Sequence, residues 1–266
     1  MSSTYASMAP ETYRKVQGKH VLILGGSSGI GLAVAEAAMA DGAKVTISSS
    51  SQAKIDSAVA SLSSSYPGST VFGIPADLSK PSVESDLDNL FQSARSAQGV
   101  INHVVYTASD GLSLGGLDSV TAEKMHNAIH FRMVVPILLA KTAARYLPKS
   151  NLSSLILTSG SLSDRPTKDS VVVSYFAGGL VSLTKALAVT LAPVRVNVVR
   201  PGIVDTGLWG FMSPEAKAAM VKGAEEKMLT RKVGVVEDVA EAYVWLLKDG
   251  NATGAVAGTD SGALLV

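Results

Sequence analysis

The residues best suited to chemistry begin with a glycine-rich turn near the N-terminus. The run Gly25-Gly26-Ser27-Ser28-Gly29-Ile30-Gly31 follows a short apolar segment and opens a helical pattern. Glycines let the chain turn tightly and let an anion approach the N–H groups of a helix N-terminus. We therefore expect a dinucleotide pyrophosphate here, bound by Gly25, Ser27, Ser28, Gly29, Ile30 and Gly31. The plainer alternative is a tight turn without a ligand.

A run of serines ends the second apolar segment. The residues are Ser48-Ser49-Ser50-Ser51, with Lys54 one turn further on. NAD-binding proteins usually have an acidic side chain here for the ribose diol. Hydroxyl groups and helix N-terminal N–H groups suit a 2′-phosphate instead. The sequence therefore predicts NADP(H), bound through Ser49, Ser50 and Ser51, although a serine-rich N-cap that tolerates either cofactor would look similar.

Short apolar runs alternate with longer helical patterns along the chain, which is typical of βαβ units. The expected strands are 20–24, 44–47, 70–74, 103–106, 154–158, 194–199 and 255–258. The expected helices are 30–40, 52–64, 83–97, 122–146, 171–191 and 236–247, with a kink at Pro136. We expect an α/β fold: a single-domain, Rossmann-like, doubly wound parallel sheet of about seven strands with helices on both faces. Ligands should bind beyond the carboxyl ends of the strands.

Composition excludes several classes of protein. The 266 residues include no cysteine, which excludes disulfides and thiolate chemistry, and the four histidines lack metal-ligand spacing. A net charge of +1 is too small to attract nucleic acid or an anionic membrane. We expect a flexible lead-in over residues 1–17 and one nucleotide-binding domain over 18–266, with a substrate lid near 207–232. Without a signal peptide or an apparent membrane span, we expect a cytoplasmic protein.

Further motifs follow the glycine turn. Asp77 and Leu78 come after the third expected strand, Ala108 comes after the fourth, and the run 197–206 reads N-V-V-R-P-G-I-V-D-T. In this order they resemble the short-chain dehydrogenase/reductase family over nearly the whole chain, although Leu24 replaces the threonine that opens the family's glycine turn. The resemblance implies a nicotinamide cofactor. The contacts that it adds are Asp77, Leu78, Ala108, Ile203 and Thr206, the last two at the nicotinamide carboxamide.

The resemblance weakens at the family's proton-transfer residues. The run Ser-Leu-Thr-Lys-Ala-Leu-Ala at 182–188 fixes the register, and it puts Val173 at the catalytic tyrosine position and Ala177 at the lysine position. None of the seven tyrosines has a lysine four residues later. The family's serine is retained at Ser159, and Arg132 occupies the position of its active-site asparagine. We expect Ser159 and Arg132 to belong to the site.

The loop after Ser159 carries Asp164 and leaves the carboxyl end of a strand. We expect Asp164 to face the substrate, although a surface ion pair with Arg165 is the plainer alternative. Ketone reduction needs a proton donor, which contributes about 10²–10⁴-fold to the rate. Hydride addition to an iminium ion yields a neutral amine directly and requires only electrostatic help, which a carboxylate supplies.

The expected lid contains Trp209, Phe211 and Met212, which suit a large apolar ligand, or alternatively pack on the lid's own core. We also expect Ser109 and Asp110 to contact the substrate. The combination is similar to a group of fungal alkaloid-pathway members of the family that lack the tyrosine–lysine pair. These are NADPH-dependent reductases and Diels–Alderases that build the bicyclic diazaoctane core of malbrancheamide- and paraherquamide-type indole alkaloids.

By that resemblance the function would be NADP(H)-dependent reduction of a cyclic iminium, coupled to an intramolecular Diels–Alder cycloaddition that needs only orientation and exclusion of water. One alternative is a ketoreductase whose acid is Asp164, Ser159 or Tyr106. The other is a non-catalytic NADP(H)-binding module. Long apolar helices at 122–146 and 171–191 also predict a homo-oligomer, a dimer or a tetramer.

Overall fold

Parallel strands form one central sheet. The computed structural model of the protein describes residues 11–109, 111 and 114–266. Within these residues the seven strands lie in the order β3-β2-β1-β4-β5-β6-β7, and all neighbours pair parallel. The strands are β1 (His20–Leu24), β2 (Lys44–Ser49), β3 (Val71–Pro75), β4 (Ile101–Tyr106), β5 (Ser154–Thr158), β6 (Arg195–Pro201) and β7 (Val256–Thr259). The predicted Rossmann-like class is confirmed.

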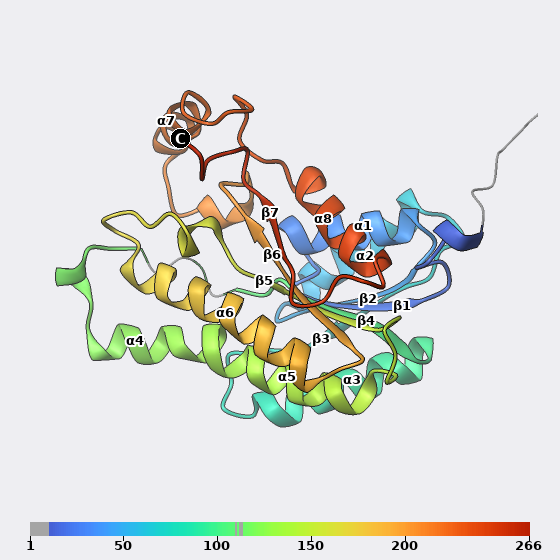
Figure 1. The fold of residues 1–266 in the computed structure, drawn as a ribbon. Coiled ribbons are helices and arrows are strands. Elements are labelled where there is room, and N and C mark those ends of the chain that lie inside the picture. The colour runs from blue at the N-terminus through green and yellow to red at the C-terminus, as the bar shows by residue number, and fades with distance from the viewer. Residues whose placement is uncertain (1–10, 110, 112–113) are drawn as a thin grey trace, which may run out of the picture.

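Helices cover both faces of the sheet (Figure 1). α1, α2 and α8 lie on one face and α3, α5 and α6 on the other, while α7 lies beyond the carboxyl ends of the strands, beside the C-terminus. Their bounds are α1 (Gly29–Ala40), α2 (Gln52–Ser65), α3 (Val83–Gln98), α4 (Ala122–Ile129), α5 (Val135–Tyr146), α6 (Val171–Thr190), α7 (Pro214–Glu225) and α8 (Val236–Lys248).

Apolar strands explain this architecture, because a strand covered by helices on both faces must be buried on both. All five residues of β1 are buried. Val21 and Ile23 pack in the core under α1 and α8, whereas Leu22 and Leu24 pack in the core under α3 and α5. The strand order reverses direction at β1 and β4, which therefore form the switch point where Rossmann-like folds bind ligands.

The predicted helix 122–146 is interrupted. A π-helical segment, His130–Val134, separates α4 from α5, and Pro136 lies in the first turn of α5. Proline has no N–H to donate, and its ring clashes with the carbonyl four residues earlier. The widened π turn therefore lies just before the predicted kink, and Arg132 lies within it.

Two other regions add detail to the expected organisation. In the expected lead-in, residues 1–10 lie outside the described residues, Glu11–Tyr13 forms a 3-10 helix, and Val16 is buried in the core while Tyr13 is exposed. The lid region contains α7, which the sequence did not predict. Among the described residues α6 is long and apolar enough to cross a membrane by length and composition alone, a test that core helices also pass.

His103, on β4, gives the fold a dependence on pH. The side chain is buried, and its Nδ1 lies 2.9 Å from the hydroxyl of Ser154. Burial, followed by the positive charges of Arg195 and Lys19, lowers the pKa of His103 to about 3. The imidazole is therefore neutral in the folded protein.

We predict that the free energy of unfolding decreases as the pH is lowered from about 6.5, the ordinary pKa of histidine, towards 3. In this range the unfolded chain binds a proton at His103 that the folded chain does not, so acid favours unfolding. Urea unfolding across this range should show a shallower decrease in His103→Gln than in wild type. His126→Gln, at an exposed position, is the control; an equal slope in both variants contradicts the prediction.

Candidate active site

The glycine turn between β1 and α1 is built from close backbone contacts. Gly25 has a φ of +88° and Gly29 a φ of +55°, in the left-handed region that favours glycine. A Cβ on Gly25 would lie 2.6 Å from the backbone N of Ala108, and a Cβ on Gly31 would lie 2.5 Å from the Thr107 hydroxyl. The turn therefore fits tightly against the end of β4, and Ala108 lies where the motif predicted it.

The N-terminus of α1 is suited to an anion. Its N-cap residue, Ser28, is extended, and its side chain makes no capping hydrogen bond in the described structure. Ser27 and Ile30 are half-buried beside it. The partial positive charge of a helix of this length favours a phosphate at this end.

Thr107 supplies a hydroxyl that the family motif would place at Leu24. Leu24 is buried in the core, and its carbonyl accepts hydrogen bonds from the Thr107 backbone N, at 2.9 Å, and from the Thr107 hydroxyl, at 3.1 Å. The end of β4 thus braces the glycine turn from the neighbouring strand. Sequence analysis missed this role, because the motif indicates which position lost a hydroxyl but not which strand end lies beside it.

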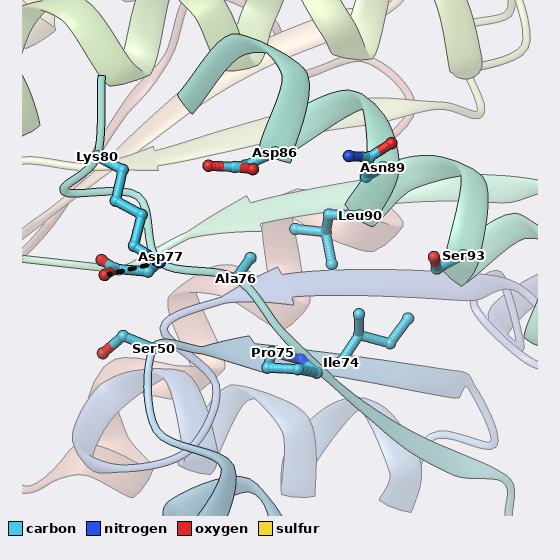
Figure 2. A pocket seen from close by; sticks show the side chains of 10 residues that line it. All are labelled: Ser50, Ile74, Pro75, Ala76, Asp77, Lys80, Asp86, Asn89, Leu90 and Ser93. Atoms are coloured by element: carbon cyan, nitrogen blue, oxygen red, sulfur yellow. Dashed lines mark ion pairs between the residues drawn. The ribbon is translucent and has the colours of Figure 1, made fainter. Parts of the chain in front are cut away.

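A cavity of about 370 Å³ lies between the end of β3 and α3, with Ser50 and Asp77 at one end (Figure 2). It is called the adenosine cavity here, after the ligand part that the sequence predicts beside Asp77. Hydrogen bonds from the Ser79 hydroxyl, at 2.6 Å, and the Ser79 backbone N, at 3.1 Å, lower the pKa of Asp77 and keep the carboxylate ionised. Lys80 lies 3.8 Å from Asp77. An ionised acceptor at this place suits the amino group of an adenine.

The predicted cofactor contacts Ser49, Ser50, Ser51 and Leu78 differ in their surroundings. Ser51 is the N-cap of α2 and accepts a hydrogen bond from the Lys54 backbone N at 3.4 Å, which matches the plainer expectation for that residue. Ser49 is half-buried and Ser50 is exposed. Leu78 is buried, and its carbonyl accepts a hydrogen bond from His130 of the π-helical segment at 2.7 Å.

Ile203 and Thr206, which the family resemblance assigns to the nicotinamide, follow β6, and this segment is called the nicotinamide end. The Ile203 carbonyl accepts from the Gly234 N at 3.1 Å, and the Thr206 hydroxyl accepts from the Leu208 N at 3.2 Å. Thr206 also faces the glycine turn, since a Cβ on Gly29 would lie 3.7 Å from its side chain. The pyrophosphate turn, the adenosine cavity and Thr206 thus lie along one edge of the sheet, and they fit an extended dinucleotide.

Ser159 lies against the first half of α6. Its hydroxyl donates to the backbone carbonyl of Ala177 at 2.9 Å. Val173, one turn earlier on the same helix, and Ala177 are both buried. The structure therefore brings Ser159 beside the two positions that the sequence register assigns to the family's tyrosine and lysine.

Asp164 forms an ion pair, but not with Arg165. Its Oδ2 lies 2.7 Å from Nη1 of Arg200 on β6, and it also accepts from the Ser163 hydroxyl. Arg165 instead donates to the Ala263 carbonyl near the C-terminus. The side chain of Asp164 is 47% exposed, so the carboxylate remains accessible while it is held.

Arg132 points to a different loop. Its guanidinium donates to the carbonyl of Gly111, in the segment after β4. Ser109 is exposed and accepts from the Gly111 N at 3.3 Å, whereas Asp110 lies outside the described residues. The buried Tyr106, one of the candidate acids, donates its hydroxyl to the Phe131 carbonyl at 3.1 Å. The π-helical segment thus contacts the ends of both β3 and β4.

The lid residues are only partly covered. The indole N–H of Trp209 donates to the Val204 carbonyl at 2.9 Å, and its ring lies 6.3 Å from that of Phe211. Phe211 is 68% exposed and Met212 is half-buried. Lys217 of α7 forms an ion pair with Asp205 at 2.5 Å, which attaches the lid to the nicotinamide end. The exposed Phe211 does not pack in a core of the lid.

The fold and this arrangement define a Rossmann-type oxidoreductase site for a nicotinamide cofactor. The sequence profile of the SDR-like Rossmann domain matches residues 13–266, so the chain belongs to the short-chain dehydrogenase/reductase family. It is 38% identical over 252 residues to the short-chain dehydrogenase/reductase ATR9 of Stachybotrys chlorohalonatus. The alignment covers 94% of this chain and 98% of that protein.

Solved structures of other family members have the same fold as this chain. The MalC reductase/Diels–Alderase from Malbranchea aurantiaca superposes with a TM-score of 0.89 at 36% identity, over 96% of this chain and 100% of that one. A small-chain dehydrogenase in complex with NADPH has a TM-score of 0.75 at 27% identity, over 93% and 99% of the two chains. The predicted family is therefore confirmed, and similarity to a fungal reductase/Diels–Alderase is a finding.

We predict that Gly31→Ala lowers affinity for NADP⁺ by about ten-fold or more and destabilises the fold by roughly 1–3 kcal/mol, because the new methyl group must displace Thr107 or the backbone of Gly25. Titration calorimetry and thermal unfolding measure the two effects. Gly179→Ala is the control, since a Cβ there has nothing within 4 Å. Equal cofactor affinity in both variants contradicts the close-contact argument.

Proposed function

We propose that the protein is an NADP(H)-dependent reductase of a cyclic iminium ion. The observation that supports this proposal is the hydrogen bond from Ser159 to the Ala177 carbonyl, which is consistent with the sequence register that assigns Val173 and Ala177 to the family's tyrosine and lysine positions. The hydroxyls of Ser159 and Tyr106 both donate to backbone carbonyls. A substrate that needs no proton donor fits these surroundings.

The chemistry balances without an acid. Bound NADPH would supply a hydride, with its electron pair, to the iminium carbon; the C=N⁺ group becomes a neutral amine and the cofactor leaves as NADP⁺. Ile203 and Thr206 would hold the nicotinamide carboxamide. Asp164 would stabilise the cation before transfer, and the apolar side chains of Val173 and Ala177 would exclude water from the reacting carbon.

We propose further that the site encloses an intramolecular Diels–Alder cycloaddition of the reduced product. Similarity to the MalC reductase/Diels–Alderase supports this step, since the match covers 96% of this chain and 100% of that one. Such a reaction needs a fixed substrate conformation rather than a nucleophile. Trp209, Phe211 and Met212 would provide an apolar surface, and Arg132 of the π-helical segment and Ser109 would provide polar contacts. Asp110, the other predicted contact, lies outside the described residues.

NADP(H) is the proposed cofactor over NAD(H). The end of β2 carries Ser49, Ser50 and Ser51 and no carboxylate, and Lys54 follows in the first turn of α2. Lys80, near Ser50 across the adenosine cavity, adds positive charge (Figure 2). A solved relative in complex with NADPH is consistent with this choice. We propose a cytoplasmic enzyme with an apolar small-molecule substrate.

We predict that Asp164→Asn lowers kcat/KM for a cyclic iminium roughly ten- to a hundred-fold, because the carboxylate stabilises the cation but is partly exposed to solvent. NADPH consumption measures the effect, with an N-methyl dihydroisoquinolinium ion as substrate and a tetralone as the matched ketone. Glu241→Gln, an exposed position on α8, is the control for loss of one negative charge.

Two outcomes would overturn the assignment. Brisk tetralone reduction that collapses in Asp164→Asn would indicate a ketoreductase with a relocated acid. Tight NADPH binding without turnover of any iminium would indicate a non-catalytic binding module.

We also propose that the protein forms a homo-oligomer, a dimer or a tetramer. Apolar side chains are exposed along α5 and the segment before it, at Met133, Val134 and Ile137, and on α6 at Val171 and Tyr175. An apolar surface of this kind is typical of a protein–protein interface.

We predict that Ile137→Glu shifts the mass measured by light scattering towards the monomer, because a charge would be buried at the interface. Val100→Glu, at an exposed apolar position in the turn between α3 and β4, should leave the mass unchanged. A monomeric wild-type protein would refute the proposal.

A further inference from the structure

We propose that Arg200 is a positioning residue for Asp164, and that Asp260 sets the charge of the pair so that the site selects cationic substrates. This inference rests on the proposed function, which makes the substrate an iminium ion. It assigns roles to Arg200 and Asp260, for which the sequence predicted none. Asp164, Arg200 and Asp260 are called the charge triad below.

The residues of the triad lie at the carboxyl ends of three neighbouring strands. Asp164 follows β5, Arg200 is next to last in β6, and Asp260 directly follows β7. Nη1 of Arg200 lies 2.7 Å from Asp164 Oδ2, and its Nη2 lies 4.0 Å from Asp260 Oδ2. One guanidinium therefore lies between two carboxylates.

The backbone is arranged to admit this guanidinium. Arg200 is paired in register with Gly258 on β7, and a Cβ on Gly258 would lie 3.0 Å from Nη2 of Arg200. The missing side chain therefore lets the arginine lie across β7. Arg200 and Asp260 are covered, with 17% and 14% of their side chains exposed, whereas Asp164 is 47% exposed.

The triad lies next to the nicotinamide end. Arg200 immediately precedes Pro201 and Gly202, and a Cβ on Gly202 would lie 2.8 Å from the Cα of Asp260. Ile203 follows directly, so the covered part of the triad, Arg200 and Asp260, adjoins the segment that would hold the nicotinamide, and we infer that Arg200 holds Asp164 on this side of the site. A mobile carboxylate at an exposed loop would lose that orientation.

Charge explains why the second carboxylate matters. An Asp164–Arg200 pair alone is neutral and would attract a cation only weakly. With Asp260, one guanidinium and two carboxylates leave the triad with a net charge of −1. The neighbouring Arg165 is exposed, so water and salt screen it more than they screen the covered Arg200 and Asp260. The site therefore keeps an excess of negative charge beside the expected position of the substrate.

Asp260 also has a structural contact, which the test must separate from its charge. Its Oδ1 accepts from the backbone N of Gly262 at 3.0 Å, and its carbonyl accepts from the Ala263 N at 2.9 Å. Asp260→Asn preserves the shape and an acceptor oxygen while removing the charge. This variant tests the electrostatic role with little change in packing.

The experiment measures binding to the NADP⁺-loaded protein by titration calorimetry. The probes are N-methylisoquinolinium, a cation, and methylnaphthalene, a neutral molecule of the same shape. In Asp260→Asn we expect affinity for the cation to fall about five- to ten-fold, and less at high salt, while affinity for the neutral probe stays within about two-fold. Glu241→Gln is the control and should change neither affinity.

Arg200→Gln provides a result of opposite sign. Removing the positive charge should strengthen binding of the cation several-fold, while kcat for the iminium falls because Asp164 loses its anchor. If Arg200 and Asp260 had only a structural role, Arg200→Gln and Asp260→Asn would not change the affinity for the cation in opposite directions. Should Arg200→Gln fail to fold, as circular dichroism would show, Asp260→Asn still decides the question.

The outcomes separate this inference from the proposed function. Equal weakening of both probes in Asp260→Asn, or no change in either, overturns the charge triad even if the wild type reduces iminium ions. Selective loss of the cation in a protein that reduces no iminium supports the triad and overturns the proposed function.

Discussion

The site depends on the close approach of the β1–α1 turn to the end of β4. Gly25 and Gly31 have no side chains, so the turn contacts Thr107 and Ala108 directly. This contact brings the N-terminus of α1 to the switch point of the sheet, where its positive end is available to an anion.

The chemistry at the other end of the site depends on β5, β6 and β7. These strands carry Ser159, Arg200 and, just beyond the last of them, Asp260 to one edge of the sheet. Ser159 is fixed by the carbonyl of Ala177, and Asp164 by the guanidinium of Arg200. The proposed iminium chemistry uses these two features, a carboxylate held in place and a serine hydroxyl that donates to a backbone carbonyl.

The sequence predicted the sheet and the glycine turn well, because both depend on local signals. The apolar run of β1 and the glycines after it are contiguous, and they form a buried strand and a tight turn. No predicted strand or helix boundary moved by more than two residues, and both ends of β1 and β5 agree with the prediction. Helix α7 was missed because its apolar face is weak: none of its residues is buried.

The partners of charged residues could not be predicted. Asp164 has Arg165 as its chain neighbour, yet it pairs with Arg200, which is 36 residues away. The choice depends on the register of β6 against β7, where Gly258 leaves room for the arginine. Thr107 was missed for the same reason, since its role depends on which strand lies beside β1. Such contacts are set by tertiary structure, and no motif spacing reports them.

The π-helical segment His130–Val134 has one more consequence. A π turn accommodates an additional residue compared with an α-helical turn. Each residue of an α-helix rotates the chain by about 100°. The extra residue therefore determines the angular orientation of all of α5, including Leu139 and Ala143, which pack inward against the sheet. A family member that lacked it would have to bury a different side of this helix.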